Sequence, residues 1–267
     1  MLANQKVILT GANSGIGFEV LKLLSREKSN TIFAVDLNLH NLTGFADNVI
    51  PYRCDVSSKE GVDGFFDAAV SAMGEITFFF ANAGYPYYEV IDYVDWDRTR
   101  RLFETNVFSP IYSYEKYREY LNGRKGLFAM TISAIGTMAM PGYTLYSASK
   151  FALNGFQQGI RFEKPDKMSI TCLYPIATDT NFFKAANPEA FEKPFPVQNP
   201  AVVAKRALRG IEKGRKRVFP SRFFSLGIVL FTIFPFLRTL YWKMEKEKLR
   251  RFIASEKVEK ENKATTR

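Results

Sequence analysis

The stretch YSASK, from Tyr146 to Lys150, places a phenol and an ammonium group four residues apart, with only small residues between them. In a helix such residues lie one turn apart on the same face, so both side chains would reach into the same space. The pKa of a free tyrosine is about 10, and a close, poorly solvated cation favours the phenolate. We therefore expect Lys150 to lower the pKa of Tyr146 and to make the pair an acid–base device. Taken alone, the same pair would more often be an exposed helix pair.

The other titratable chemistry is sparse. The 267-residue chain has one histidine, His40, and two cysteines, Cys54 and Cys172, with no CxxC or HExxH motif. These counts argue against histidine-based triads, a metal site and a disulfide framework, and they are typical of a reducing compartment. Any acid–base step is therefore expected to use Tyr, Lys, Asp or Glu.

A glycine-rich turn, ILTGANSGIGFEV, joins an apolar run to a helical stretch through Gly11, Gly15 and Gly17. Glycine permits a tight turn and lets backbone N–H groups approach a pyrophosphate beside the positive end of a helix. Asp36 comes 19 residues after Gly17 with no Lys or Arg beside it, so it can bind ribose hydroxyls and would repel a 2′-phosphate. We expect NAD(H) as the cofactor, with NADP(H) less favoured. A turn without a ligand and a solvated loop aspartate are the competing interpretations.

Apolar runs alternate with amphipathic stretches such as Phe18–Arg26 and Asp95–Asn122. Continuous apolar runs are typical of parallel strands covered on both faces, and repeating βα units predict a doubly wound sheet. The expected fold class is α/β, a Rossmann-type single domain over residues 1–220. The predicted strands are Lys6–Thr10, Thr31–Asp36, Val49–Val56, Ile76–Ala81, Gly126–Ser133, Met168–Tyr174 and Lys216–Pro220.

Five motifs in this order resemble the short-chain dehydrogenase/reductase family over about residues 4–220: TGANSGIG (Thr10–Gly17), NAG (Asn82–Gly84), Asn106, Ser133 and YSASK. The resemblance implies that Tyr146 is the catalytic acid/base and that Lys150 lowers its pKa and holds the nicotinamide ribose. It implies that Ser133 polarises the substrate carbonyl and that Asn106 positions a water in the proton relay.

The resemblance also implies cofactor contacts along the chain. Asp55 and Val56 would meet the adenine, and Thr178 and Thr180 would hold the nicotinamide amide. The chain departs from the family pattern at Ala81, where a second asparagine is usual, and at Ile176, where glycine is common. The second departure leaves the size of the substrate open. The full expected set is Gly11, Asn13, Ser14, Gly15, Ile16, Gly17, Asp36, Asp55, Val56, Asn82, Ala83, Gly84, Tyr146, Lys150, Thr178 and Thr180.

After Pro220 the pattern changes to an apolar segment with basic flanks. The uncharged run Phe223–Leu237 has 15 residues, whereas a membrane span needs about 20. Residues 221–267 carry 11 Lys/Arg against 5 Asp/Glu. We expect residues 221–254, and 223–251 in particular, to lie on a membrane surface. A true span, and a soluble element that covers the pocket or forms a subunit interface, are the alternatives. Residues 255–267 are expected to form a polar tail.

Together these features predict an NAD(P)-dependent oxidoreductase that interconverts a ketone or aldehyde and an alcohol, on a hydrophobic or lipid-like substrate at a membrane surface. A nucleotide-binding scaffold or sensor without turnover is the alternative function. The basic charges flank an apolar run instead of forming a groove, so no nucleic-acid partner is expected. The N-terminus lacks a signal-peptide pattern, which favours the cytoplasmic side of a membrane. The resemblance implies a homodimer or homotetramer.

Overall fold

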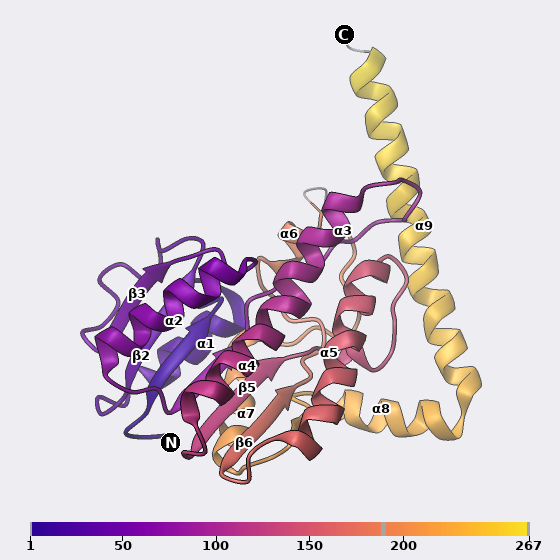
Figure 1. Ribbon diagram of the computed structural model, residues 1–267. Helices are drawn as coiled ribbons and strands as arrows, with labels where there is room; N and C mark the ends of the chain where they lie inside the picture. Colours follow the sequence, from indigo (N-terminus) through magenta and orange to yellow (C-terminus); the bar gives the residue numbers. More distant parts are fainter. Residues whose placement is uncertain (1, 188–190, 266–267) are drawn as a thin grey trace.

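A computed structural model of the chain describes residues 2–187 and 191–265. They form one seven-stranded parallel sheet in the order β3-β2-β1-β4-β5-β6-β7, which confirms the predicted doubly wound α/β domain (Figure 1). All the predicted strands are present, and several are shorter than expected. The strands are β1 (Lys6–Thr10), β2 (Thr31–Asp36), β3 (Val49–Arg53), β4 (Phe78–Ala81), β5 (Gly126–Thr131), β6 (Met168–Leu173) and β7 (Arg217–Val218).

Helices cover both faces of the sheet. On one face α1 (Gly15–Leu24) packs beside α7 (Pro200–Glu212), and their buried residues join one hydrophobic cluster. On the other face α2 (Lys59–Met73), α4 (Ser109–Leu121) and α5 (Thr144–Glu163) close a second cluster. The remaining helices are α3 (Trp96–Phe103), α6 (Phe182–Ala186), α8 (Arg222–Ile233) and α9 (Pro235–Thr265), with a π-helical segment η1 (Glu104–Phe108) and a 3-10 turn η2 (Ala134–Gly136).

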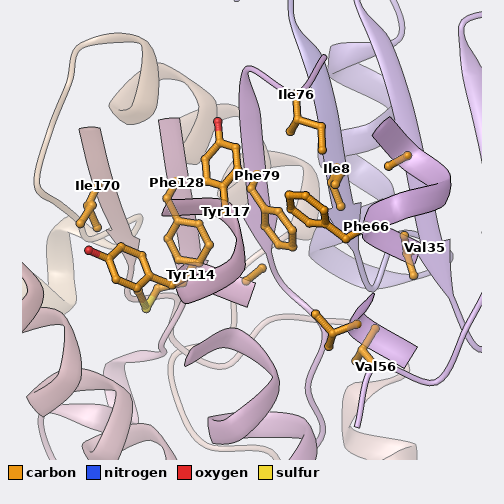
Figure 2. Close-up of a cluster of buried hydrophobic side chains, with 14 of the residues drawn as sticks. Ile8, Val35, Val56, Phe66, Ile76, Phe79, Tyr114, Tyr117, Phe128 and Ile170 are labelled. Atoms are coloured by element: carbon orange, nitrogen blue, oxygen red, sulfur yellow. The ribbon is translucent and has the colours of Figure 1, made fainter. Parts of the chain in front are cut away.

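The strand residues divide between the two clusters by alternation. Ile8, Phe79 and Phe128 point to the α2–α4–α5 face, as Figure 2 shows, while Phe78 and Phe80 point to the opposite face. Successive side chains of a strand leave on opposite faces, so a sheet covered on both sides needs apolar residues at every position. This requirement explains the continuous apolar runs in the sequence.

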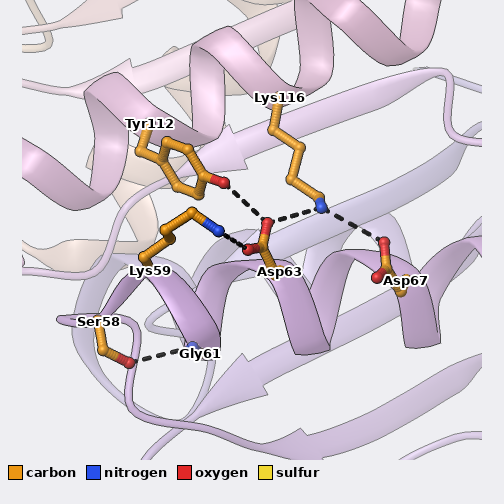
Figure 3. A network of polar contacts seen from close by, with 7 residues as sticks. All are labelled: Ser58, Lys59, Gly61, Asp63, Asp67, Tyr112 and Lys116. Carbon is orange, nitrogen blue, oxygen red and sulfur yellow. Dashed lines mark hydrogen bonds and ion pairs between the residues drawn. The ribbon is translucent and has the colours of Figure 1, made fainter.

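A charged network joins α2 to α4 on the surface. Asp63 lies between Lys59 and Lys116, at 2.6 and 2.7 Å, and it also accepts a hydrogen bond from the Tyr112 hydroxyl (Figure 3). Lys116 reaches Asp67 as well, at 3.4 Å. The hydrogen bond from Lys116 and then that from Lys59 hold the pKa of Asp63 well below its usual range. The network therefore fixes the position of α4 against α2.

The helix predicted over Asp95–Asn122 contains one irregular stretch. α3, η1 and α4 follow one another without a gap, and η1 adopts the π form around Asn106, whose side chain is fully buried. Single π turns inside helices often mark functional positions. Here the wider turn coincides with a residue that the sequence assigned to the site.

The two C-terminal helices behave differently from each other. No residue of α8 is buried, whereas α9 inserts Phe252 into a cluster that includes Tyr88, Tyr143 and Phe183. In Figure 1 α8 leaves the domain and α9 turns back along it. Among the described helices none is by itself long and apolar enough to cross a membrane. α8 and the first part of α9 have the required length and apolar composition only when taken together, and the chain bends by 119° between them. α9 also continues through residue 254, where a polar tail was expected to begin, as far as Thr265.

Candidate active site

A cavity of about 570 Å³ lies where the carboxyl ends of β1, β2, β4 and β5 meet. In an open parallel sheet this edge is where ligands bind. The cavity brings together residues that are far apart in the sequence. Those from the expected set that line it are Gly11, Ser14, Gly15, Ile16, Asp36, Asp55, Val56, Asn82, Ala83, Gly84, Ser133, Tyr146, Thr178 and Thr180.

The glycine-rich turn is packed too tightly for any side chain. A Cβ on Gly17 would lie 1.9 Å from the carbonyl oxygen of Gly11, and a Cβ on Gly11, whose φ is +67°, would lie 2.9 Å from the Cα of Ala83. The Asn82 amide donates to the same Gly11 carbonyl at 3.2 Å. The turn and the NAG segment thus form one unit, and the N-terminus of α1 is left facing the cavity as a phosphate cradle.

Asp36 is held in a fixed orientation at the end of β2. One carboxylate oxygen accepts a hydrogen bond from the Asn13 N–H at 2.9 Å, and the other accepts from the Asn38 N–H at 3.1 Å. Asn13 itself is braced from behind, since its side-chain oxygen accepts from the Asn41 N–H at 2.9 Å. Asn13 is not among the residues that line the cavity; its N–H orients Asp36, and a direct contact of Asn13 with the cofactor stays a prediction.

The two threonines after β6 meet the glycine turn from the other side. The Thr178 hydroxyl donates to the Ile176 carbonyl at 2.8 Å, and the Thr180 hydroxyl accepts from the Phe182 N–H at 3.2 Å. A Cβ on Gly15 would lie 3.3 Å from the Thr180 methyl group. Ile176, which stands where the family pattern has glycine, lines the cavity and narrows it.

Ser133 and Tyr146 lie beside each other on the wall of the cavity. Ser133 has a φ of +112°, a conformation that costs a non-glycine residue free energy and persists only when its surroundings impose it. Its hydroxyl donates to the Pro175 carbonyl at 3.3 Å and accepts from the Ile135 N–H at 3.3 Å. The strained backbone therefore fixes the hydroxyl beside the phenol of Tyr146.

Tyr146 and Lys150 lie close together, and burial is the main influence on the pKa of each. The ammonium of Lys150 is 5.6 Å from the centre of the Tyr146 ring and donates to the Thr131 carbonyl at 3.2 Å. Burial raises the pKa of Tyr146, and the nearby Ser133 hydroxyl only partly opposes this. Burial also lowers the pKa of Lys150 to about 7. That Lys150 lowers the pKa of Tyr146 stays a prediction.

Asn106 holds two segments together behind the cavity wall. Its amide donates to the Tyr85 carbonyl at 2.9 Å and to the Ser149 hydroxyl at 3.2 Å, and its oxygen accepts from the Tyr85 N–H at 3.1 Å. A Cβ on Gly84 would lie 2.9 Å from that oxygen and 3.4 Å from the Lys150 ammonium. Asn106, Lys150 and Gly17 thus support the wall without lining it.

Several residues of the cavity were not among those expected. These residues are Arg101, Thr105, Tyr143, Phe224 and Tyr241. Tyr143 is a second buried phenol, and its hydroxyl finds no hydrogen-bond partner within the described residues. Arg101 and Thr105 are four residues apart and share a helix face, which could have indicated them together. A pocket cover was one alternative for the segment after Pro220, but nothing in the sequence singles out Phe224 and Tyr241 within it.

Comparison with known proteins agrees with this geometry. The sequence profile of the short chain dehydrogenases matches residues 5–190. The 3beta-hydroxysteroid dehydrogenase 2 of Eggerthella lenta is 32% identical over 197 residues, which cover 68% of this chain and 74% of that protein. The fold is similar to an enzyme from Burkholderia phymatum in complex with NAD (TM-score 0.75, 18% identity, 89% and 97% of the two chains). The fold is also similar to a short chain dehydrogenase from Burkholderia cenocepacia in complex with NADP (TM-score 0.73, 22% identity, 86% and 93% of the two chains). The chain belongs to the short-chain dehydrogenase/reductase family.

Proposed function

We propose that the chain is an NAD(H)-dependent oxidoreductase that interconverts a ketone or aldehyde and an alcohol, with Tyr146 as the acid/base. The observation that carries the proposal is the meeting of three side chains at the cavity wall: Ser133 lies beside the phenol of Tyr146, and the Lys150 ammonium is 5.6 Å from the centre of that phenol ring. A bound nicotinamide would supply or accept the hydride. Because its pKa is raised, Tyr146 is a neutral phenol at pH 7, the form that donates a proton to the oxygen of a reduced carbonyl.

The other residues act on the same oxygen or behind it. Ser133, fixed by its backbone, would donate to the carbonyl oxygen as negative charge develops there. Lys150 would hold the nicotinamide ribose. Asn106 would keep the Tyr85 segment and α5 at the spacing that a proton relay needs.

The cofactor site fits a dinucleotide with two free ribose hydroxyls. The glycine cradle leaves room for a pyrophosphate and for no side chain, and Asp36 is held by the Asn13 and Asn38 N–H groups. A carboxylate in this position would accept from the adenosine ribose hydroxyls and repel a 2′-phosphate. These contacts support NAD(H) over NADP(H).

The substrate is proposed to be hydrophobic. The wall on the substrate side is formed by apolar and aromatic side chains with few polar groups, and Phe182 packs edge-on against Tyr146 at 5.5 Å. An apolar wall of this kind excludes water from the reacting group and favours an alkyl or ring system over a sugar or an amino acid. The members of this wall include Met138, Met140, Ile176, Phe182, Phe183 and Phe195.

A membrane surface is proposed as the partner of the C-terminal helices. Their outward side chains include Phe223, Ile233 and Phe236, each more than 60% exposed, and a contiguous patch of this kind marks an interaction surface. The flanking lysines and arginines suit anionic headgroups, and a bent apolar helix pair suits insertion into the interfacial region. α9 also contributes Tyr241 to the cavity wall and packs Phe252 beside Tyr143, which supports a pocket cover in the same segment as the anchor.

An oligomer is proposed on the resemblance alone. The family pairs through the two helices that here carry Asn106 and Tyr146, and Phe108 and Phe151 on these elements are 57% and 44% exposed. Light scattering of the purified chain would measure the assembly. A monomer at all concentrations would contradict this part of the proposal.

The test is NADH oxidation with methyl ketones of increasing chain length, with Tyr146→Phe as the blank and NADPH in parallel. We expect rates that rise with chain length, need Tyr146 and prefer NADH. NADH binding without turnover of any ketone would instead favour the nucleotide-binding scaffold. For the membrane, we expect Phe236→Glu to release the protein from anionic vesicles in a flotation assay. Phe162→Glu, which changes an even more exposed phenylalanine on α5 (93% against 65%), should leave the protein bound.

A further inference from the structure

The cavity extends from the catalytic group to the C-terminal helix pair. Phe224 in the first turn of α8 and Tyr241 near the start of α9 both line it, together with Phe195 of the loop after α6. The helices therefore do more than attach the protein to a surface. Their junction with the domain forms part of the wall around the substrate.

The α9 side of this wall is held firmly. The Tyr241 hydroxyl donates to the Phe195 carbonyl at 3.0 Å. One turn further on, Lys248 pairs with Glu245 at 3.0 Å, and both side chains are buried. Lys248 also donates to the Lys193 carbonyl at 3.4 Å. The buried Lys248 ammonium thus bonds both to Glu245 and to the backbone of the loop after α6, and it holds that loop against α9.

The α8 side is held loosely. None of its residues is buried. The Phe224 ring meets the domain at Phe219, with ring centres 6.3 Å apart, and the Phe231 ring stacks on Tyr241 of α9, with ring centres 6.0 Å apart, so that an opening movement of α8 must break these ring contacts. On the outer face of α8 the apolar residues Phe223, Leu226, Leu230 and Ile233 follow helical spacing and are exposed. The weakly held wall is therefore the one next to the apolar surface.

We infer that the entrance for the substrate lies between Phe224 on α8 and the Tyr241–Phe195 pair, and that it opens toward the lipid in which α8 lies. This inference rests on the proposed function, including the membrane surface. Opening requires movement of α8, because α9 and its loop are joined by the buried Glu245–Lys248 pair.

The same geometry specifies the shape of the substrate. A cavity of about 570 Å³ is the size that holds one drug-sized ligand, and because its lining runs from Asp36 and Asp55 to Tyr146, it must accept the dinucleotide as well. A long alkyl chain cannot be enclosed in the remaining space, so it must leave through the entrance. The substrate class is a ketone or alcohol whose reacting carbon lies near one end of an alkyl chain, with the rest of the chain in the bilayer.

The test compares two adjacent phenylalanines. Phe224→Trp narrows the entrance, whereas Phe223→Trp makes the same change on the exposed face and serves as the matched control. The substrates are 2-hexadecanone and 8-hexadecanone in phosphatidylcholine–phosphatidylglycerol vesicles, and 2-hexanone in buffer. We expect wild-type protein to prefer 2-hexadecanone over 8-hexadecanone. We expect Phe224→Trp to lower kcat/KM for 2-hexadecanone about tenfold by overpacking and to lower it much less for 2-hexanone. Phe224→Ala should raise the rate with 8-hexadecanone.

Equal effects of the two tryptophan variants, or equal loss for 2-hexanone and 2-hexadecanone, would overturn the entrance. A readout independent of activity is quenching of tryptophan fluorescence by brominated phospholipid. We expect both the Phe224→Trp and the Phe223→Trp proteins to show more quenching than wild-type protein. Extra quenching in Phe223→Trp alone would overturn the entrance and leave the proposed membrane surface intact. Absence of turnover with all three ketones, by contrast, counts against the proposed function itself.

Discussion

Lys116 and Lys150 show what a lysine does with and without a carboxylate partner. Lys116, in the network between α2 and α4, is 20% exposed and pairs with Asp63 at 2.7 Å. Burial lowers its pKa, but the hydrogen bond and charge of Asp63 outweigh this and leave the pKa raised. Lys150 is 3% exposed and meets only a backbone carbonyl, and burial lowers its pKa to about 7.

The difference separates a structural charge from a functional one. The ammonium of Lys116 is already neutralised by Asp63, so it has no capacity to act on a ligand. No carboxylate in the described part of the chain pairs with Lys150, and a buried charge without a partner is costly. Such a group gains most from a ligand that supplies hydrogen-bond acceptors, which is what ribose hydroxyls would do. The four predictions that follow test this contrast.

The largest expected effect is the loss of kcat when the phenol of Tyr146 is removed, with the phenol of Tyr112 as the matched control. Tyr146→Phe removes the acid/base and should lower kcat by about 10³-fold. Tyr112→Phe removes the phenol that donates to Asp63 and should leave kcat unchanged. Steady-state NADH oxidation with the best ketone measures both. Retention of more than a tenth of the rate by Tyr146→Phe would assign the proton transfer to another group.

The two lysines should respond in opposite ways to replacement by methionine. Lys150→Met should lower kcat about 10²-fold, because the cofactor and phenol lose their positioning, and should raise the free energy of unfolding at pH 7. Lys116→Met should leave kcat unchanged. Urea denaturation together with kinetics separates the two outcomes. A Lys150→Met protein that is less stable than wild type would show that the ammonium is well solvated, contrary to its burial.

The pH dependence of stability should carry the signature of Lys150. Its pKa is about 7 in the folded protein and about 10.4 when unfolded, so between these values the unfolded state binds more protons. Stability should therefore rise with pH above 7, by up to about 1.4 kcal/mol per pH unit from this group. Urea denaturation at pH 7 and 8.5 measures the slope, and Lys150→Met should lack it. Equal slopes in both proteins would place the lysine pKa near its ordinary value.

The smallest kinetic effect is expected at Asp36. Two backbone N–H groups hold the Asp36 carboxylate, whereas two lysine ammonium groups hold the carboxylate of Asp63. Asp36→Asn keeps one hydrogen-bond acceptor and removes the negative charge that would repel a 2′-phosphate. The preference for NADH over NADPH should therefore fall about tenfold, which corresponds to a loss of about 1.4 kcal/mol of repulsion. Asp63→Asn is the control and should leave the preference unchanged. The ratio of kcat/KM for the two cofactors is the readout.

The sequence determined the sheet and most of the site. Seven apolar runs predicted seven strands, since only residues buried on both faces lack polar alternation. Gly11, Gly17 and Asp36 were indicated by their place after predicted strands, and Tyr146 and Lys150 by helical spacing, whereas Ser133 was indicated by the family resemblance. Gly11, Asp36, Ser133 and Tyr146 meet in the cavity because the ends of parallel strands lie at one edge of the sheet. Boundaries were less exact, and β7 is two residues long where five were expected, because an edge strand pairs on one side only.

Tertiary structure alone decided the electrostatics and the C-terminal segment. The pKa values of Tyr146 and Lys150 depend on how completely the surrounding elements exclude water, and a spacing of four residues says nothing about that. The π form around Asn106 was equally invisible in the sequence. Composition predicted that residues 223–251 avoid water but not where they lie. Only the fold places Phe224 and Tyr241 on the wall of the cavity, because that contact joins residues more than 70 positions from Tyr146 in the chain.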